Sequence, residues 1–337
     1  VKPGLVGLQS DYDDFVNITP VACWSTVRRS TAYTGPAIRV EDAGNPGTAI
    51  DVNFDSDGRL TGSPPYGADT RVITIYDQYG SEDLTAAYTA GITISEVNDE
   101  RGSWQIVCDN GVGMYAPTNT GSSPAWELGS MVWAFAGERT QAETSQHIAW
   151  GVDESASSMS IGVWVDSSDD WNWSVNASSA SDWSGTNWTT DSADVQGEVS
   201  RLIGDLSHAS DAKAYFNNTL AQTKSSSLPV TYDSGKSLGL FDWNGSGAPW
   251  TGTFEELTIF DHDGELSSDN RGWLDDALDE FTERVEYQSL QELDLYTVTG
   301  IKTGGQLMNT LEVYSVSANA NAGYEFLSGI EIYVIEP

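Results

Sequence analysis

Aromatic and short polar side chains gather in two stretches of the sequence, and this combination is typical of a sugar-binding site. Aromatic faces stack on the C–H surfaces of sugar rings, while carboxylates and amides bond hydroxyl groups. The candidate carbohydrate-binding residues of the first stretch, 164–188, are Asp166, Asp170, Trp171, Trp173, Trp183 and Trp188. Those of the second stretch, 241–250, are Asp242, Trp243, Asn244 and Trp250. An equally weighted alternative is that Trp164, Trp171 and Trp173 alternate into a hydrophobic core while the other rings pack a long loop.

Other reaction chemistry has few candidate residues in this chain. The cysteines are Cys23 and Cys108, and the histidines are His147, His208 and His262. Neither cysteine lies in a CxxC motif, so a zinc site or a nucleophile paired with histidine has few residues to be built from. The cysteines could form one disulfide or remain two buried thiols. We therefore expect no cofactor and no metal centre.

A structural calcium ion or bound monovalent cations would nonetheless be compatible with so many acidic loops. Asn53, Asp55, Asp57 and Gly58 follow the spacing of a calcium-binding loop. However, Pro64 stands where the bidentate acid of such a loop is expected. We therefore favour a hairpin turn at this position over a calcium site.

The net charge excludes several classes of partner. The 337 residues include 50 Asp and Glu against 15 Lys and Arg, which gives a formal net charge of −35. A nucleic-acid-binding protein needs a basic surface to neutralise phosphates, and an anionic membrane surface would repel this chain. The sequence also has no run of roughly 18 apolar residues, the length that spans a bilayer. We expect neither a nucleic-acid partner nor membrane insertion.

The kind of acidity predicts a salt-adapted protein. Lys is scarce, Asp outnumbers Glu, and the acids are spread over the whole chain. At about 1 M salt the Debye length is roughly 3 Å, so the self-repulsion of such a surface is screened. The alternative is an acidic protein loaded with calcium, which we disfavour because the acids do not gather into one ligand pattern.

Period-two alternation recurs along the chain and predicts many short strands. Turn signals such as Asp57-Gly58 and Asn110-Gly111 separate the runs, which indicates an antiparallel sandwich. Helical spacing occurs at 195–206 and, more clearly, at 267–285, where a serine cap and early acids precede an apolar stripe that includes Trp273. The clearest strand signals lie at 70–76, 91–97, 104–108, 131–135, 159–165, 254–260 and 290–298.

Several short blocks resemble a known family. They are Arg28-Arg29, Ala32-Tyr33-Thr34-Gly35-Pro36, Phe54 followed by Asp57-Gly58, and Tyr76-Asp77-Gln78. This pattern resembles the catalytic domain of the α-L-arabinofuranosidase B type and the phage and archaeal-virus structural proteins related to it, all with concanavalin A-like, laminin-G-like domains. The resemblance implies an all-β antiparallel jelly-roll sandwich with one C-terminal edge helix. We interpret the blocks as structural, with Asp77 and Gln78 bonding loop backbone in preference to a ligand.

Three parts follow from this resemblance and from the composition. We predict an extended N-terminal arm at 1–20, a lectin-type sandwich at 21–286 and a β appendage for assembly at 287–337. Beyond Tyr287 the chain has one Lys, no Arg and no Trp, and its clearest strand signals lie at 311–316 and 330–335. So short a segment is small for an independent core.

The pair of catalytic carboxylates that the resemblance implies is incomplete in this sequence. The resemblance places the carboxylate nucleophile at Ser168, and a serine cannot serve as that carboxylate. It places the acid at Asp242, with an offset of one residue, while Asp169 or Asp170 could substitute for the missing nucleophile. Retaining glycosidases need two carboxylates about 5 Å apart. We therefore assign no catalytic residues and expect a protein that is not an enzyme.

The sequence as a whole predicts a structural and recognition protein on the outside of a virion, such as a tail-fibre or baseplate component of a haloarchaeal virus. The expected partners are other copies of the chain in a trimer or pentamer, other virion proteins, and a host-surface glycan or S-layer glycoprotein. Unpaired edge strands in the terminal parts would suit such assembly. The alternatives are a secreted, salt-adapted glycoside hydrolase of the arabinofuranosidase type and a purely architectural capsid decoration.

The salt-adapted composition gives the first testable prediction. In dilute, calcium-free buffer the chain should unfold because its negative charges repel one another, and about 2 M KCl alone should restore the fold. Circular dichroism at both salt concentrations measures the change. Rescue by millimolar calcium, with no rescue by KCl, would instead identify a calcium-loaded protein.

Overall fold

The computed structural model divides into two compact units, Val1–Arg284 and Val285–Pro337. In the second unit, β19 (Leu295–Val298) and β20 (Leu311–Tyr314) form an antiparallel pair. The predicted strand at 330–335 lies outside the described residues. The structure describes residues 12–15, 18–86, 92–96, 104–108, 113–116, 131–140, 147–155, 158–165, 171–175, 186–188, 199–206, 211–225, 238–241, 250–262, 264–281, 295–298 and 311–314.

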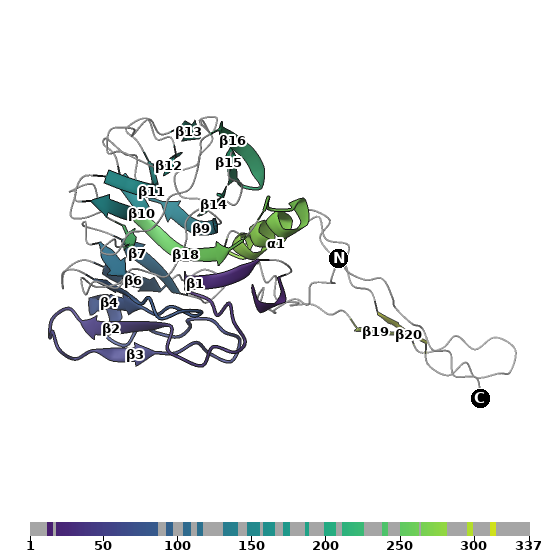
Figure 1. The fold of residues 1–337 in the computed structure, drawn as a ribbon. Coiled ribbons are helices and arrows are strands. Elements are labelled where there is room, and N and C mark those ends of the chain that lie inside the picture. Colours follow the sequence, from purple (N-terminus) through teal and green to yellow (C-terminus); the bar gives the residue numbers. More distant parts are fainter. Residues whose placement is uncertain are drawn as a thin grey trace, which may run out of the picture. The chain divides into compact units, whose positions relative to one another are not determined.

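The first unit (Figure 1) is built from one hydrogen-bonded sheet of 18 described strands, which divides at strand β4 into two antiparallel sheets packed as a sandwich. The first residues of β4 pair with β6 in the second sheet, and its last residues pair with β5 in the first sheet. The strands of the first sheet are, in spatial order, β3 (Ile50–Val52), β2 (Ile38–Asp42), β4 (Thr70–Ile75), β5 (Leu84–Ala86), β8 (Met114–Ala116), β17 (Leu238–Leu240), β10 (His147–Ser155), β11 (Ser158–Val165), β12 (Trp171–Val175) and β13 (Thr186–Trp188).

In the second sheet, β18 is the central strand. Its first residues pair with β7 and its later residues with β1, and β9 pairs along its other side. The strands of the second sheet beyond β4 are, in spatial order, β6 (Ile92–Glu96), β7 (Trp104–Cys108) with β1 (Thr19–Ser25), β18 (Gly252–Asp261), β9 (Met131–Arg139), β14 (Val199–Asp205), β15 (Asp211–Phe216) and β16 (Thr219–Ser225). The predicted all-β antiparallel sandwich is thus confirmed.

Side chains that face each other between the two sheets form the main core, which contains Trp24, Trp133 and Trp150. A second core covers the outer face of the second sheet, beneath α1 (Ser268–Asp279) and the short 3₁₀ helix η1 (Tyr12–Asp14). Another short 3₁₀ helix, η2 (Gly67–Asp69), precedes β4. No helix in the described part of the chain is long and apolar enough to span a membrane.

Helix α1 begins as predicted, because the Ser267 side chain accepts a hydrogen bond from the Asn270 backbone N–H at 3.1 Å. Leu274, Ala277 and Leu278 face the sheet and are buried. Trp273 does not share this face, since it is 44% exposed. The helix ends at Asp279, earlier than predicted, and residues 282–285 lie outside the described residues.

The helix predicted at 195–206 is wrong, because residues 199–205 form strand β14. Leu202 faces the main core, whereas Ile203 faces the second core beneath α1. Both faces of this strand are therefore buried. Apolar residues on both faces imitate the spacing of a helix, so the pattern alone could not separate the two structures.

The cysteines are two free, buried thiols, so the disulfide alternative does not apply. Cys23 lies on β1, and its Sγ accepts a hydrogen bond from Thr258 Oγ1 at 3.1 Å. Cys108 ends β7 opposite Gly252 and Ile92.

In the turn at 55–58, the Asp55 carboxylate accepts hydrogen bonds from the turn itself and from the residues just after it. The Asp55 carboxylate accepts hydrogen bonds from the backbone N–H of Asp57 and Arg59, at 2.9 and 2.8 Å, and from the Thr61 hydroxyl. Gly58 has a φ of 72°, the left-handed conformation that glycine adopts at little cost. This arrangement fits the predicted turn.

Asp77 and Gln78 bond loop backbone, as favoured from the sequence. The Asp77 carboxylate accepts from the backbone N–H of Cys23, Tyr79 and Glu82. The Gln78 side chain accepts from the Arg29 N–H at 2.7 Å and donates to the Val27 carbonyl at 2.8 Å. Both residues therefore fix the start of the sandwich.

A bulge in β18 directs one glutamate away from the main core. The register with β9 shifts between Phe254 and Glu256, so Phe254 and Leu257 both face the main core. Glu256 then faces the opposite side of the sheet, where it is fully buried. A bulge of this kind changes which face a side chain points to without ending the strand.

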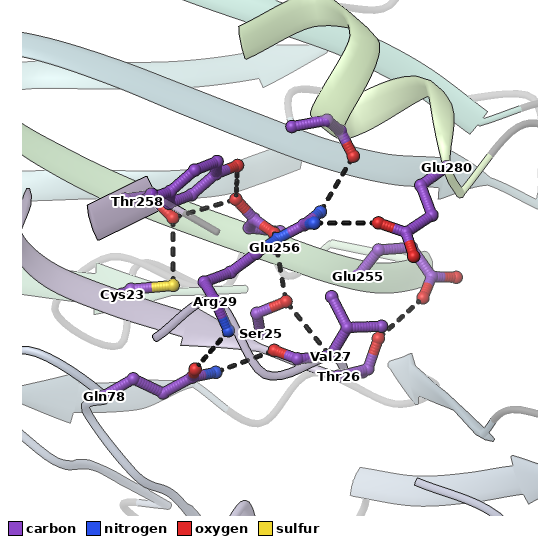
Figure 2. Close-up of polar contacts among 12 residues, drawn as sticks. Cys23, Ser25, Thr26, Val27, Arg29, Gln78, Glu255, Glu256, Thr258 and Glu280 are labelled. Carbon is purple, nitrogen blue, oxygen red and sulfur yellow. Dashed lines mark hydrogen bonds and ion pairs between the residues drawn. The ribbon is translucent and has the colours of Figure 1, made fainter. Parts of the chain in front are cut away.

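Figure 2 shows the polar network around this glutamate. The Arg29 guanidinium, also fully buried, contacts Glu256 at 2.6 Å and Glu280 at 2.8 Å, and it donates to the Ala277 carbonyl at 2.8 Å. The network thus joins the chain after β1 to β18 and to the end of α1.

Aromatic rings close this network on two sides. The rings of Tyr12 and Phe281 each lie 5.1 Å from the Arg29 guanidinium carbon. The Tyr12 hydroxyl also donates to Glu256, and burial raises its pKa, so it donates as a neutral phenol. Residues 12–14 and the start of β1 at Thr19 therefore belong to the sandwich, although the sequence predicted an extended arm there. Residues 1–11 of that arm lie outside the described residues.

Removing Arg29 should destabilise the fold strongly. Arg29→Met leaves Glu256 as an uncompensated buried charge, which should lower the free energy of unfolding by about 3–5 kcal/mol. The matched control is Arg39→Met, because Arg39 pairs with Asp51 at 3.2 Å with exposed fractions of 41% and 45%, and such an exposed pair contributes little to stability. Urea unfolding in constant salt measures both variants. Equal, small losses would contradict the importance of the network.

Asp83, which lies beside Asp77, should make the stability of the fold depend on pH. Burial raises the pKa of Asp83 above its ordinary 3.8, the Asp77 N–H bond opposes the rise, and the Asp77 charge adds to it. Above the pKa that Asp83 has in the folded chain, its buried charge therefore destabilises the fold. This destabilisation disappears below pH 3.8, where Asp83 is protonated in both the folded and the unfolded chain. Asp83→Asn should stabilise at pH 7 and become neutral at low pH, as measured by urea unfolding. A gain that does not change with pH would contradict this assignment.

Candidate functional site

The two candidate stretches are attached to the same end of the first sheet. Strand β11 ends at Val165, opposite Trp171 at the start of β12 and His147 at the start of β10. Strand β17 ends at Leu240, opposite Trp150, which is also near the start of β10. The ends of β11 and β17 therefore lie at one end of the sheet, on either side of β10. We call this the loop end.

Two of the predicted sugar-stacking residues are core residues in this structure. Trp171 and Trp250 are both fully buried, and their ring centroids lie 5.2 Å apart with 36° between the planes. Trp171 also contacts Phe135 at 6.1 Å. A sugar cannot stack on either ring without displacing the core. The core-packing alternative named Trp171 and describes it; it did not name Trp250, which is also a core residue.

The position of these rings gives them a different role at the site. Trp171 is the first described residue after segment 166–170, and Trp250 is the first after segment 242–249. Their contact therefore holds the roots of the two segments next to each other beneath the loop end. The sequence placed both residues at the site but could not distinguish an anchor from a ligand-contacting ring.

Phe241, which the sequence analysis did not single out, fixes the other root of segment 242–249. Its φ of 68° is left-handed, an uncommon conformation for a bulky residue that costs about 1–2 kcal/mol. Two backbone hydrogen bonds hold it there, from its N–H to the Ala149 carbonyl at 2.8 Å and from the Trp250 N–H to its own carbonyl at 2.7 Å. Its ring packs edge-on against Phe254. No feature of the sequence signals this conformation, because glycine and asparagine are the usual residues there.

The remaining candidate residues are placed only in part. The backbone of Trp173 lies on β12 opposite Val163 and Thr186, and that of Trp188 lies on β13 opposite Trp171. Six candidates lie outside the described residues: Asp166, Asp170, Trp183, Asp242, Trp243 and Asn244.

The outer face of the first sheet carries a second feature that the sequence analysis missed. Gly162, Gly151 and Gly239 lie directly opposite one another on β11, β10 and β17, which leaves a row without side chains. Beside this row, Trp164 lies opposite Asn172, and both are buried. Glycines inside strands often mark the close approach of a ligand or another backbone. Each glycine is visible in the sequence, but only the register brings the three together.

In the described part of the loop end, Trp171 and Trp250 are packed in the core, and backbone hydrogen bonds fix Phe241 at the end of β17. The carboxylates that could bond a sugar or act on it come from segments outside the described residues. Among the described residues, no group of three or more His, Cys, Asp or Glu side chains could hold a metal ion.

Neither a family model nor a curated protein matches this sequence. Solved structures of β-sandwich glycoside hydrolases are similar in fold. One is a GH54 α-L-arabinofuranosidase mutant soaked with 4-nitrophenyl α-L-arabinofuranoside, with a TM-score of 0.58, and another is an arabinofuranosidase complexed with arabinofuranosyl-α-1,2-xylobiose, with a TM-score of 0.57. Each is 12% identical to this chain and is matched over 79% of it. The matches cover only 63% of each of those chains. The likeness shows the fold, a sandwich of the kind implied by the resemblance in the sequence.

Proposed function

We propose that this chain binds glycans at the loop end of its first sheet and does not hydrolyse them. The observation that carries the proposal is the contact between Trp171 and Trp250, which brings together the described residues that follow segment 166–170, with three Asp and two Ser, and segment 242–249, with one Asp, one Trp and one Asn. Such segments combine aromatic faces with short hydrogen-bonding side chains, as sugar sites do.

The fold likeness supports the choice of ligand class. Of the two arabinofuranosidase structures with this fold, one was soaked with 4-nitrophenyl α-L-arabinofuranoside and the other is complexed with arabinofuranosyl-α-1,2-xylobiose. We therefore propose that the ligand is a neutral glycan built from furanose or pyranose sugars. A neutral ligand also avoids the repulsion that a net charge of −35 would exert on an anionic one.

Hydrolysis is the second candidate function, and the fold likeness favours it equally. The resemblance places Ser168 where a carboxylate nucleophile is needed, so a catalytic pair would have to come from Asp166, Asp169 or Asp170 together with Asp242. Retaining enzymes hold such a pair about 5 Å apart. The missing carboxylate is the reason for preferring binding alone.

The biological setting of the chain is proposed from its composition and from the family resemblance. We propose a virion-surface, tail-fibre or baseplate protein of a haloarchaeal virus, assembled from several copies and bound to a host-surface glycan. The support comes from the acidic, Lys-poor composition and from the resemblance of the Tyr33–Pro36 and Tyr76–Gln78 blocks to viral proteins. A secreted enzyme and an architectural capsid decoration without a ligand remain the alternatives.

A glycan array probed in about 2 M KCl tests the proposal, because we expect the fold to need salt to screen its charge. We expect binding by the wild type and a loss of about tenfold in affinity for Asp242→Asn, the size expected when a charged hydrogen-bond acceptor is lost. Asp276→Asn, on the exposed side of α1, is the matched control and should bind like the wild type.

Two outcomes would overturn the proposal. Release of arabinose from an aryl arabinofuranoside, abolished by Asp242→Asn, would establish the hydrolase. Absence of binding and of release from a folded chain would favour the architectural role. Native mass spectrometry of the assembly would then separate a multimeric virion component from a monomeric enzyme.

A further inference from the structure

We propose that Asn217, at the tip of the β15–β16 hairpin, is an acceptor for an N-linked glycan. Asn217, Asn218 and Thr219 form the sequon Asn-x-Thr, in which the side-chain amide nitrogen of the asparagine receives the sugar. This inference does not rest on the proposed glycan-binding function. It concerns a sugar attached to the chain, and the hairpin belongs to the second sheet.

The structure distinguishes an accessible sequon from a buried one. The sequence contains six sequons, which begin at Asn17, Asn172, Asn176, Asn187, Asn217 and Asn244. The structure describes the side chains of two of these asparagines. Asn172 is only 2% exposed, so a transferase cannot reach it in the folded chain. Asn217 is exposed, as are the two residues that follow it, so a glycan at this position leaves the packing of the sandwich intact.

Asn217 and Asn218 are the two residues of a tight hairpin turn. Their φ angles are 44° and 62°, both left-handed, as in a type I′ turn. Asparagine is one of the few residues besides glycine that adopt this conformation readily. The turn therefore fixes the sequon at the tip of the hairpin, in solvent.

The hydrogen bonds of Asn217 leave its amide nitrogen available. Its backbone N–H donates to the Arg201 carbonyl at 2.9 Å, and its side-chain Oδ1 accepts from the Arg201 N–H at 3.1 Å. Because a backbone N–H can only donate, the amide atom that faces it must be the oxygen. The other amide atom, Nδ2, donates to no described residue, so a sugar can be attached there without breaking a hydrogen bond.

Two neighbours of the turn form a seat for the first sugar. Phe216 and Thr219 lie directly opposite each other across the turn, so their side chains share one face of the hairpin. Phe216 is packed against the main core but is only partly buried. An aromatic face beside the acceptor can stack on the C–H surface of a sugar ring. The first sugar thus gains a contact that a sequon in a bare loop lacks.

A glycan on Asn217 also shields an edge of the sandwich. In the described part of the chain, β16 pairs only with β15, which makes it an edge strand. Leu220, the residue after the sequon, is 51% exposed on this strand. Edge strands with exposed apolar residues can pair between molecules, and the charges that usually oppose such pairing are screened in molar salt. A bulky glycan blocks the pairing sterically at any salt concentration.

The modification uses a donor and a transferase of the host. The bond between the anomeric carbon of the first sugar and the diphosphate of a lipid-linked oligosaccharide breaks, and the lipid diphosphate leaves. The same carbon forms a bond to Nδ2 of Asn217, whose proton passes to a base of the transferase. The Thr219 hydroxyl completes the acceptor signal, so both residues of the sequon must be present.

Mass spectrometry tests the site on the full chain secreted by a haloarchaeal host that attaches N-glycans. We expect a glycan on the chymotryptic peptide that contains Asn217 and none on the peptide that contains Asn172. Asn217→Gln and Thr219→Ala should each lower the mass of the intact chain by one glycan, whereas Thr219→Ser keeps the sequon and should keep the mass. An unmodified Asn217, in a culture whose own surface glycoprotein is modified, would overturn the proposal, as would a glycan on Asn172.

The seat is tested by the fraction of chains that carry the glycan. Phe216→Ala should lower this fraction several-fold although the sequon is intact. The matched control is Phe54→Ala, because Phe54 is also a partly buried ring packed against the main core and lies far from the hairpin in the sequence. Equal occupancy in the two variants would overturn the role of Phe216.

Light scattering in about 2 M KCl tests the shielding of β16. Asn217→Gln should aggregate where the wild type stays soluble, and adding Leu220→Ser to that variant should restore solubility. An unglycosylated Asn217→Gln chain as soluble as the wild type would overturn the shielding role.

Discussion

The buried ion pair between Arg29 and Glu256 is the constraint on which the rest of the sandwich depends. Two charges removed from water cost several kcal/mol each unless their partners compensate. Here the partners come from η1, β1, β18 and α1, so these elements must meet in one arrangement. The bulge at Glu255 is part of the same constraint, because it turns Glu256 toward Arg29 while Phe254 and Leu257 stay in the main core.

The geometry of the loop end depends on that arrangement. The strand that carries Glu256 begins at Gly252, directly after Trp250. Fixing the register of β18 against β1 and β9 therefore fixes where Trp250 enters the core and where it meets Trp171. The left-handed Phe241 adds local strain at the point where segment 242–249 begins, and strain of this kind persists only where the surroundings over-determine it.

Much of the fold could be predicted from the sequence because alternation and turn residues report directly on antiparallel strands. The pattern failed at β14, where Leu202 and Ile203 face different cores and imitate a helix. It also left Trp171 and Trp250 ambiguous, since a ring at a strand end has the same sequence context whether it faces the core or a ligand. The glycine row on β11, β10 and β17 depends on register between distant strands, which no single sequence displays.

A glycan bound at the loop end should leave a footprint of slowed backbone amide exchange there. We expect protection at the end of β11, the starts of β10 and β12, and the end of β17, around Val165, Trp171 and Leu240. No added protection is expected at α1 or at the β2–β3 edge. A footprint centred on either of those places, or on the far ends of the same strands, would contradict binding at the loop end.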